Sequence, residues 1–290
     1  MVIVKIIGGL GNQMFQYAAG KSLAKRLGSP LKLDLSSFGS YGLRTFELER
    51  FSIRYELATS GELARYANKH PFLSAASKLL FRRDMFENPL VYKERAFHYD
   101  AGVLKISKDV YLSGYWQSER YFEVISEEIR DEFTFRQVMS GRNMRIAREI
   151  SSCNAVSLHV RRGDYANNPE TKSYHGLCSA VYYDAAIDHI SDKVESPHYF
   201  VFSDDLDWVR TNLKLPQPVT FVDGNHGTQS YNDMRLMSLC KHNIIANSSF
   251  SWWGAWLNSN HDKIVIAPSR WFNSARHDTR DLYCPGWVVL

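Results

Sequence analysis

Residues 2–14 of the chain read VIVKIIGGLGNQM, and this stretch decides how the chain begins to fold. Val2–Ile7 is a run of mostly β-branched residues, which predicts a strand. The glycine-rich turn ends this run, and Gln13–Leu27 then predicts a helix that Gly28 terminates. Leu31–Leu35 predicts a second strand after the helix.

From residue 139 onward, predicted helices and strands alternate with short loops. Strands are expected at residues 155–160, 199–202, 219–222, 243–246 and 263–267, and helices at 140–150, 179–190, 206–213, 229–241 and 250–259. This order predicts a parallel sheet wound by right-handed crossovers. In the first half, Val110–Ser113 predicts a short strand and Glu119–Asp131 a helix that Ser118 caps. We therefore expect an α/β fold.

The composition limits the classes of function. The 290 residues suffice for one large domain or two of ordinary size. The net charge of +4 is far below that of a protein built to bind nucleic acid, so nucleic acid is not expected as a partner. Aromatic residues make up 13% of the chain, which favours a ligand with flat apolar faces, such as a sugar or a base.

Cysteine content and hydropathy indicate the compartment. The four cysteines contain no CxxC pair, which predicts neither a zinc site nor a disulfide framework. No apolar run approaches the ~20 residues of a membrane-spanning helix. We therefore expect a protein of the cytoplasm.

Ligands of parallel α/β sheets bind at the carboxyl ends of the strands, and the first such end is the glycine turn. The backbone N–H groups of Gly9, Gly11, Asn12 and Gln13 can approach an anion at the start of the helix. The third glycine of the dinucleotide fingerprint is replaced by Met14, and no Lys-Ser/Thr pair follows to make a P-loop. The alternative is a tight turn with Asn12 as the helix cap.

The next strand end, residues 158–165, reads LHVRRGDY and concentrates charge. Arg161 and Arg162, together with His159 and Asp164, are costly to place beside a sheet unless an anion neutralises the arginines. Because the guanidinium fork binds phosphate oxygens in bidentate fashion, the cluster predicts a diphosphate site. The alternative is a structural ion pair between Asp164 and one arginine.

Acidic residues follow the strand expected at residues 199–202. Asp205 and Asp207 form a D-x-D pair of the kind with which metal-dependent sugar transferases hold a divalent ion. Acids at a helix start also stabilise the helix dipole without any metal. A further possibility is that Asp204 or Asp205 accepts hydrogen bonds from the edge of a guanine base.

The strand expected at residues 243–246 leads into Asn247, Ser248 and Ser249, which can cap a helix and donate to phosphate or sugar oxygens. The helix that follows contains Trp252, Trp253 and Trp256, whose spacing is more typical of a core than of a sugar platform.

Three of these four strand ends lie in the second half of the chain, and the glycine turn lies in the first. This distribution favours two domains, residues 1–138 and 139–290, that face each other across a cleft. The last residues could pack back on the first domain.

Together these segments resemble the α-1,2-fucosyltransferases of glycosyltransferase family 11. The resemblance rests on residues 8–18 (GGLGNQMFQYA), 113–117 (SGYWQ), 159–165 (HVRRGDY) and 247–255 (NSSFSWWGA). It implies a GT-B-like fold of two Rossmann-like domains and GDP-β-L-fucose as donor. It also implies inverting transfer to the 2-hydroxyl of a terminal β-galactoside, with no metal and no cofactor.

The same resemblance assigns roles at the donor site. Arg161 is similar to the arginine that grips the β-phosphate and assists departure of GDP, and His159 and Arg162 to neighbours that orient donor and loop. Asp204 or Asp205 would meet the guanine. The remaining donor contacts would come from Gly9, Gly11, Asn12, Gln13, Asn247, Ser248, Ser249 and Phe250.

A general base and an acceptor wall complete the expected site. Asp164 is the first candidate for the base, with Glu170 and His175 as competitors, unless the departing phosphate itself takes the proton. The segment Tyr115, Trp116 and Gln117 of the first domain would stack on the acceptor sugar, or would instead pack in the core.

Two other functions are compatible with parts of this sequence. Asp205 and Asp207 would serve a metal-dependent sugar transferase, and a chain that kept only the fold would be a non-catalytic module for a nucleotide or a glycan.

The short form resembles bacterial members that build O-antigen or other surface glycans from the cytoplasmic side. Residues 65–95 hold seven basic and three acidic residues, 7 − 3 = +4, which is the whole net charge. Because apolar residues lie among them, this segment predicts peripheral contact with anionic lipid of the inner membrane. A solvated basic face is the alternative.

Overall fold

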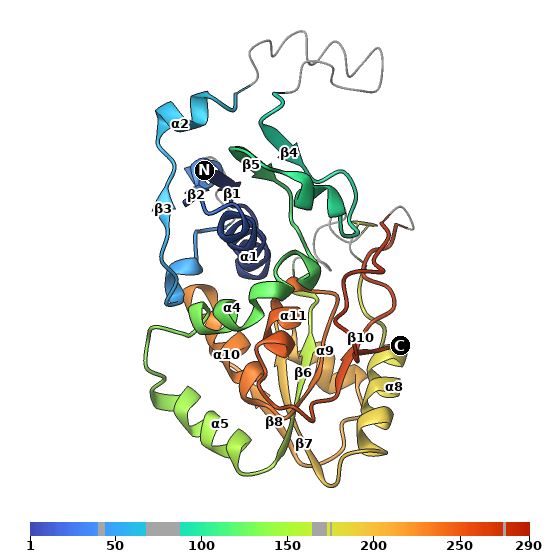
Figure 1. The fold of residues 1–290 in the computed structure, drawn as a ribbon. Helices are drawn as coiled ribbons and strands as arrows, with labels where there is room; N and C mark the ends of the chain where they lie inside the picture. The colour runs from blue at the N-terminus through green and yellow to red at the C-terminus, as the bar shows by residue number, and fades with distance from the viewer. Residues whose placement is uncertain (40–43, 68–87, 164–172, 175, 275–276) are drawn as a thin grey trace. The chain divides into compact units, whose positions relative to one another are not determined.

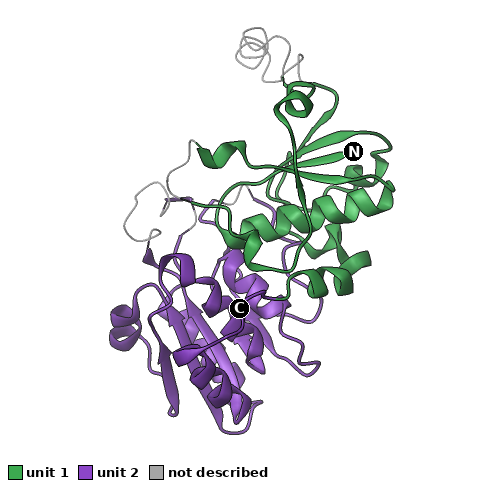
Figure 2. Ribbon diagram, turned by 90° about the vertical axis from the view of Figure 1, so that its left-hand side faces the viewer, with its two compact units in different colours: residues 1–134 green, residues 135–290 purple. Residues whose placement is uncertain are grey.

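The structure is a computed structural model that describes residues 1–39, 44–67, 88–163, 173–174, 176–274 and 277–290. The chain forms two compact units, residues 1–134 and residues 135–290 (Figure 2). Each unit contains one parallel sheet together with helices. Both units are therefore α/β, as the alternation of elements predicts. The domain boundary expected after residue 138 falls four residues beyond this division.

Unit 1 has a five-stranded sheet in the order β3-β2-β1-β5-β4, with every pairing parallel (Figure 1). The strands are β1 (Val2–Lys5), β2 (Leu31–Asp34), β3 (Glu56–Leu57), β4 (Val91–Lys93) and β5 (Val110–Ser113). Helix α1 (Leu10–Arg26) packs closely on β1, because a Cβ atom at Gly20 would lie only 2.2 Å from Cγ2 of Val4. The strand order reverses beside β1, so the glycine turn after β1 lies at the switch point of this sheet.

Helix α1 begins three residues earlier than the sequence predicts. Gly9 is its N-cap in an extended conformation, and Gly8 before it has a φ of 79°, which glycine adopts readily and other residues do not. A Cβ atom on Gly8 would also lie 2.8 Å from Nδ2 of Asn12. Asn12 therefore lies inside the first turn of the helix, and the interpretation of Asn12 as the cap is wrong.

The helix expected over residues 119–131 is interrupted. The segment folds as two short 3₁₀ turns, η4 (Glu119–Tyr121) and η5 (Glu123–Ile125), followed by α4 (Ser126–Glu132). Ser118 caps η4 as expected, by accepting from the N–H of Arg120. Phe122 has a φ of −139° and a fully buried ring 6.3 Å from that of Phe15, so burying this ring breaks the helix. The other elements of unit 1 are η1 (Ser36–Gly39), η2 (Leu48–Arg50), α2 (Ser60–Ala64) and η3 (Ala101–Lys105).

Unit 2 has a six-stranded parallel sheet in the order β11-β10-β9-β6-β7-β8. The strands are β6 (Asn154–Val160), β7 (Pro197–Ser203), β8 (Val219–Val222), β9 (His242–Ile244), β10 (Val265–Ala267) and β11 (Val288–Val289). Strands β7 and β8 follow in order on one side of β6, and strands β9, β10 and β11 follow in order on the other. This is the strand order of a Rossmann fold, and its switch point lies between β6 and β9. The last residues pair, as β11, with β10 of this sheet.

Helices cover both faces of the sheet in unit 2. Those on one face are α8 (Ala180–Ser191) and α9 (Leu206–Asn212), and the apolar residues of both pack with those of β6 and β7. The other face packs against α5 (Gly141–Ser151) and α10 (Tyr231–Leu239). Helix α11 (Ser249–Trp256) packs on α10 and closes this layer. The strands and helices predicted after residue 139 all form, with small shifts of their ends.

The tryptophans of α11 belong to the core. Trp252, Trp253 and Trp256 are each at most 2% exposed. The core interpretation of these residues is therefore confirmed.

Among the described residues, no helix is both long enough and apolar enough to cross a bilayer.

Candidate functional site

The candidate site of unit 2 lies at the carboxyl edge of its sheet, where β6 and β9 are neighbours. Crevices at such switch points are where sheets of this kind bind ligands. Strand β6 runs directly into Arg161, and the loop after β9 runs into the start of α11. The ring of His159, near the end of β6, lies 5.9 Å from the ring of Phe250 in α11. The structure therefore brings two of the predicted strand ends together.

Asp204 joins the end of β7 to the end of β6. Its Oδ2 lies 2.5 Å from Nη1 of Arg161, and its Oδ1 accepts from the backbone N–H of Arg162 at 2.8 Å. Strand β7 pairs with β6 along its whole length, so its end delivers Asp204 to this position. The side chains of Arg161 and Asp204 are each 25% exposed, so a ligand in solution can reach both.

Arg162 braces the strand end. Its Nε lies 3.2 Å from Oδ2 of Asp205, and its guanidinium group lies over the ring of Trp208 at 4.0 Å. Asp205 in turn caps α9, where its Oδ1 accepts from the N–H of Trp208. Arg162 is held by both an ion pair and a ring and is 17% exposed, against 25% for Arg161, so Arg161 is the better candidate for binding an anion.

Gly163 has no room for a side chain, since a Cβ atom there would lie 2.5 Å from Oδ2 of Asp204. We expect Gly163→Ala to lower the free energy of unfolding by about 1 to 3 kcal/mol, the usual cost of forcing an extra methyl group into a packed site. Urea unfolding would measure the change. The matched control is Gly163→Ala combined with Asp204→Ala. If overlap is the cause, this double variant loses no more than Asp204→Ala alone, and a strictly additive loss contradicts the prediction.

His159 is buried and neutral. Burial lowers the pKa of its imidazole to about 4; the Asp204 carboxylate opposes this shift and the Arg161 guanidinium adds to it. Its Nδ1 has no hydrogen-bond partner among the residues that the structure describes. A neutral ring at the base of the arginine site avoids a second positive charge there, which would repel Arg161.

Asn247 fixes the loops around the site. It is 2% exposed, and its Nδ2 donates to the carbonyl oxygens of Gly176 at 3.4 Å and Trp271 at 3.3 Å. Its Oδ1 accepts from Sγ of Cys178. The Asn247 side chain therefore faces protein, although it was expected to contact the donor directly.

Ser248 caps α11, because its Oγ accepts from the N–H of Phe250. Ser249 and Phe250 are half-buried at the start of this helix. The free N–H groups of a helix start attract anions, so α11 presents a second anion-binding feature next to Arg161.

The D-x-D pair does not converge on one point. Asp205 caps α9, whereas Asp207 has a 96% exposed side chain and pairs with Arg210 of the same helix at 3.2 Å. No group of three acidic, histidine or cysteine side chains that could hold a metal exists within the described part of the chain. The geometry thus favours the helix-dipole interpretation of these acids.

In unit 1, Gln13 organises the glycine turn. It is fully buried, and its Nε2 donates to the carbonyl oxygens of Gly8 and Thr45 at 2.9 and 2.8 Å. Its Oε1 accepts from the N–H of Glu47. Gln16 lies one turn further along, and its Oε1 accepts from the N–H of Ile7. Sequence reasoning missed Gln16, although a second buried glutamine on the same helix was the available signal.

The expected acceptor segment lies at the same edge of unit 1 as the glycine turn. Nε2 of Gln117 donates to Oδ1 of Asn12 at 2.7 Å. Trp116 is fully buried, so its indole belongs to the core and presents no face to a sugar. Tyr115 is 42% exposed and is the aromatic ring of this segment that a ligand can reach.

Glu94 is a site residue that the sequence reasoning missed. It follows β4 and accepts from the N–H groups of Tyr115 and Trp116 at 2.7 and 2.9 Å. Burial raises the pKa of its carboxyl group, against the lowering effect of these two donors. No local pattern marks Glu94, because its partners lie 21 and 22 residues away.

Several predicted residues lie outside the described part of the chain. These are the three candidates for the general base, Asp164, Glu170 and His175, and residues 68–87 of the basic segment. Their roles in proton transfer and in membrane contact stay predictions.

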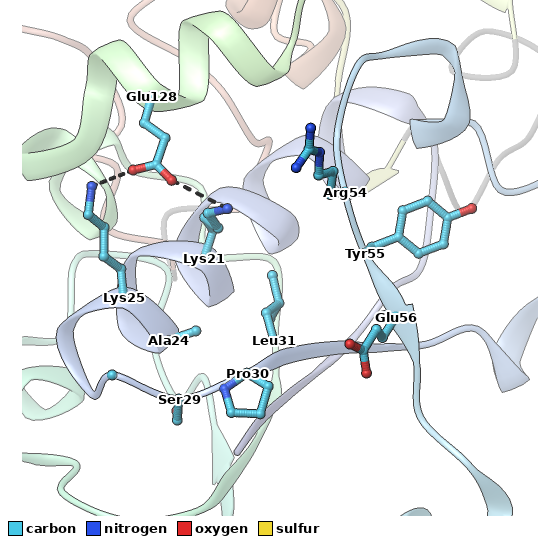
Figure 3. A pocket seen from close by; sticks show the side chains of 11 residues that line it. Lys21, Ala24, Lys25, Ser29, Pro30, Leu31, Arg54, Tyr55, Glu56 and Glu128 are labelled. Atoms are coloured by element: carbon cyan, nitrogen blue, oxygen red, sulfur yellow. Dashed lines mark hydrogen bonds and ion pairs between the residues drawn. The ribbon is translucent and has the colours of Figure 1, made fainter.

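A cavity of about 550 Å³ lies in unit 1, away from the glycine turn of that unit (Figure 3). It opens at the amino end of β2, beside the end of α1, and none of the predicted site residues lines it. Its charges compensate one another: Glu128 pairs with both Lys21 and Lys25, and Lys21 also lies 2.7 Å from Glu132. Arg54 and Glu56 also line the cavity, so its wall holds three basic and two acidic side chains, and most of this charge is compensated.

Comparison with known proteins places these features in context. The model of the family "Glycosyl transferase family 11" matches residues 92–290. An α-1,2-colitosyltransferase of Escherichia coli is 36% identical over 100% of this chain and 99% of its own. The O-antigen biosynthesis glycosyltransferase WbnK of Escherichia coli is 35% identical over 98% of both chains. The galactoside α-(1,2)-fucosyltransferase 1 of Ateles belzebuth is 27% identical over 54% of this chain and 44% of its own.

A solved structure supports the fold. The fucosyltransferase NodZ from Bradyrhizobium superposes with a TM-score of 0.52 at 13% identity, covering 87% of this chain and 91% of its own. At this identity the likeness concerns the fold alone, which is the GT-B-like class that the sequence predicts.

Proposed function

Because the chain belongs to glycosyl transferase family 11, we propose that it transfers L-fucose from GDP-β-L-fucose to the 2-hydroxyl of a terminal β-galactoside. The transfer inverts the anomeric configuration and gives an α-1,2 linkage. We assign the reaction to the assembly of a bacterial surface glycan, since one similar protein is named for O-antigen biosynthesis.

The observation that supports this proposal is the group of candidate anion-binding side chains at the carboxyl edge of unit 2. Arg161, the start of α11 and the neutral His159 come together beside the switch point, which suits a diphosphate. In the reaction the bond between the sugar C1 and the β-phosphate oxygen breaks, and its electron pair stays on that oxygen. Arg161 donates to the phosphate as this charge grows, and the acceptor oxygen bonds to C1 from the opposite face.

The acceptor hydroxyl must also lose a proton, and Asp164 is the proposed base. We expect Asp164→Asn to lower kcat by about 10²- to 10⁴-fold, the usual contribution of general base catalysis, with little change in the KM of the donor. Glu170→Gln and His175→Asn are the matched variants, each measured in steady-state transfer assays. If Asp164→Asn keeps most of its kcat and one of the others does not, the base is the other residue.

Colitose is a second candidate for the transferred sugar. The observation that favours it is the 36% identity, over the whole chain, to an α-1,2-colitosyltransferase. Colitose lacks the 3-hydroxyl group of fucose, so a donor site for one sugar needs few changes to take the other.

A donor panel tests the proposal. Purified protein is incubated with lactose and either GDP-fucose or GDP-colitose, with and without excess EDTA, and the product linkage is determined by NMR. We expect an α-1,2-linked product from GDP-fucose and the same rate in EDTA. A product from GDP-colitose alone establishes the second candidate, and loss of activity in EDTA supports a metal-dependent transferase. Binding of GDP without release of GDP from either donor indicates a non-catalytic module.

A further inference from the structure

The carboxylate of Glu94 holds an unusual turn at the carboxyl edge of unit 1. Its Oε2 accepts from the N–H of Tyr115 and its Oε1 from the N–H of Trp116, so one side chain receives two consecutive backbone donors. The backbone N–H of Glu94 also donates to the carbonyl oxygen of Ser113, which continues the pairing of β4 with β5. Glu94 is therefore fixed to the end of β5 by both its backbone and its side chain.

The turn that Glu94 holds is one that the chain does not adopt readily. Trp116 has a φ of 57°, a left-handed conformation that is unfavourable for a bulky residue unless the surroundings stabilise it. Gly114 leaves no space for a Cβ atom, which would lie 2.4 Å from Cβ of Glu94. The indole of Trp116 is fully buried and packs with the rings of Tyr92 and Tyr121. Glu94 and this aromatic packing together stabilise the turn.

The turn places one aromatic ring at the surface, that of Tyr115. Trp116 is fully buried and Gln117 is 8% exposed, whereas Tyr115, directly before them in the chain, is 42% exposed. Gln117 ties the same segment to Asn12 in the first turn of α1. An exposed aromatic ring with a rigid backbone, beside polar groups, suits the apolar face of a pyranose ring.

From this arrangement we infer that Glu94 is a positioning residue for the acceptor: it sets the turn that presents Tyr115 as the stacking surface for a galactoside. The inference rests on the proposed function for the identity of the acceptor. Glu94 acts through Tyr115. Its replacement is therefore expected to weaken binding of the acceptor and to leave binding of the donor unchanged.

Kinetic constants test this role. Glu94→Gln keeps the shape of the side chain but sets an amide N–H₂ against one of the two backbone donors. We expect the KM for lactose to rise about tenfold, which corresponds to one lost hydrogen bond to a charged group, with the KM for GDP-fucose unchanged. Glu123→Gln, on an exposed acid of the same unit, is the control and should behave as wild type. An unchanged KM for lactose, or an equal rise in both KM values, overturns the inference.

A double-mutant cycle separates positioning from general structural damage. Tyr115→Ala is expected to raise the KM for lactose by a similar factor, and Glu94→Gln combined with Tyr115→Ala by no more than Tyr115→Ala alone. Independent, multiplying effects of the two changes contradict the positioning role. Thermal unfolding of all variants shows whether they remain folded.

Direct binding of methyl β-galactoside, followed by saturation-transfer NMR, distinguishes failure of this inference from failure of the proposed function. Binding by the wild-type protein that weakens in Glu94→Gln supports the inference even if no sugar is transferred from GDP-fucose. Transfer to lactose with binding that is equal in wild type and Glu94→Gln overturns the inference and leaves the function intact. Absence of any binding by the wild-type protein overturns the inference as well.

Discussion

Arg161→Ala is expected to lower kcat for fucosyl transfer by at least about a thousandfold, because one preorganised donor to a developing oxyanion contributes 10²- to 10³-fold and Arg161 also carries a full charge. The guanidinium group lies at the end of β6, beside the start of α11 and 2.5 Å from Asp204. Negative charge grows on the β-phosphate as the bond to the sugar breaks. Among the described residues, Arg161 is best placed to stabilise this charge.

The loss is expected in catalysis more than in folding. The Arg161 side chain is 25% exposed, and Asp204 keeps its hydrogen bond from the N–H of Arg162 when Arg161 is removed. The measurements are kcat at saturating donor and acceptor, and the midpoint of urea unfolding. Arg161→Lys keeps the charge but loses the bidentate fork, so we expect it to recover only part of the activity.

Arg210→Ala is the matched control for charge removal. Arg210 is a half-exposed arginine of the same unit, and it pairs with Asp207 in a surface contact of a kind that contributes little. We expect this variant to be as active as wild type. Turnover near the wild-type value in Arg161→Ala, with this control behaving as expected, would remove Arg161 from the mechanism.

Trp252→Ala is expected to lower the free energy of unfolding by about 3 to 5 kcal/mol, as for other large aromatic residues removed from a core. Trp252 is fully buried, its Nε1 donates to the carbonyl oxygen of Leu282 at 2.8 Å, and its ring lies within 5.5 Å of those of Trp253 and Trp287. The substitution leaves a cavity and an unpaired carbonyl oxygen. Both effects destabilise the fold.

Urea unfolding measures this loss of stability. Two further variants show which part of it comes from the Trp252 ring and its N–H donor. Trp252→Phe keeps an apolar ring but loses the N–H donor, so its effect should be smaller. Val181→Ala, at a 76% exposed position on α8, should change the stability by no more than about 0.5 kcal/mol. If Trp252→Ala instead keeps its stability and loses affinity for galactosides, the ring is a sugar platform and not part of the core.

Much of unit 2 can be predicted from its sequence, because long apolar strands alternate with helices and the ends of parallel strands meet at one edge. His159 and Phe250 are brought together for this reason. The pairing of Arg161 with Asp204 could not be predicted, because it depends on β7 lying next to β6. Strands of two residues, such as β3 and β11, are too short to show any periodicity.

Unit 1 is less predictable, because tertiary packing decides its local structure. Phe122 would continue a helix by propensity, yet burial of its ring interrupts that helix. Trp116 and Tyr115 are neighbouring aromatic residues, and nothing in their order tells which one is buried. The contact with Glu94 that separates them joins residues more than 20 positions apart.

The ion pair between Arg161 and Asp204 makes anion binding at the end of β6 selective. Arg161 already has a carboxylate partner, so an anion that binds it competes with Asp204 for the same positive charge. The net gain is then smaller than it would be at an arginine with no partner. We expect such a site to bind monoanions weakly, because they compete poorly with the carboxylate of Asp204. Its affinity for groups of high charge density, such as a diphosphate, is expected to be higher. Without a bound anion, Asp204 is paired with Arg161, so the strand end does not carry an uncompensated charge.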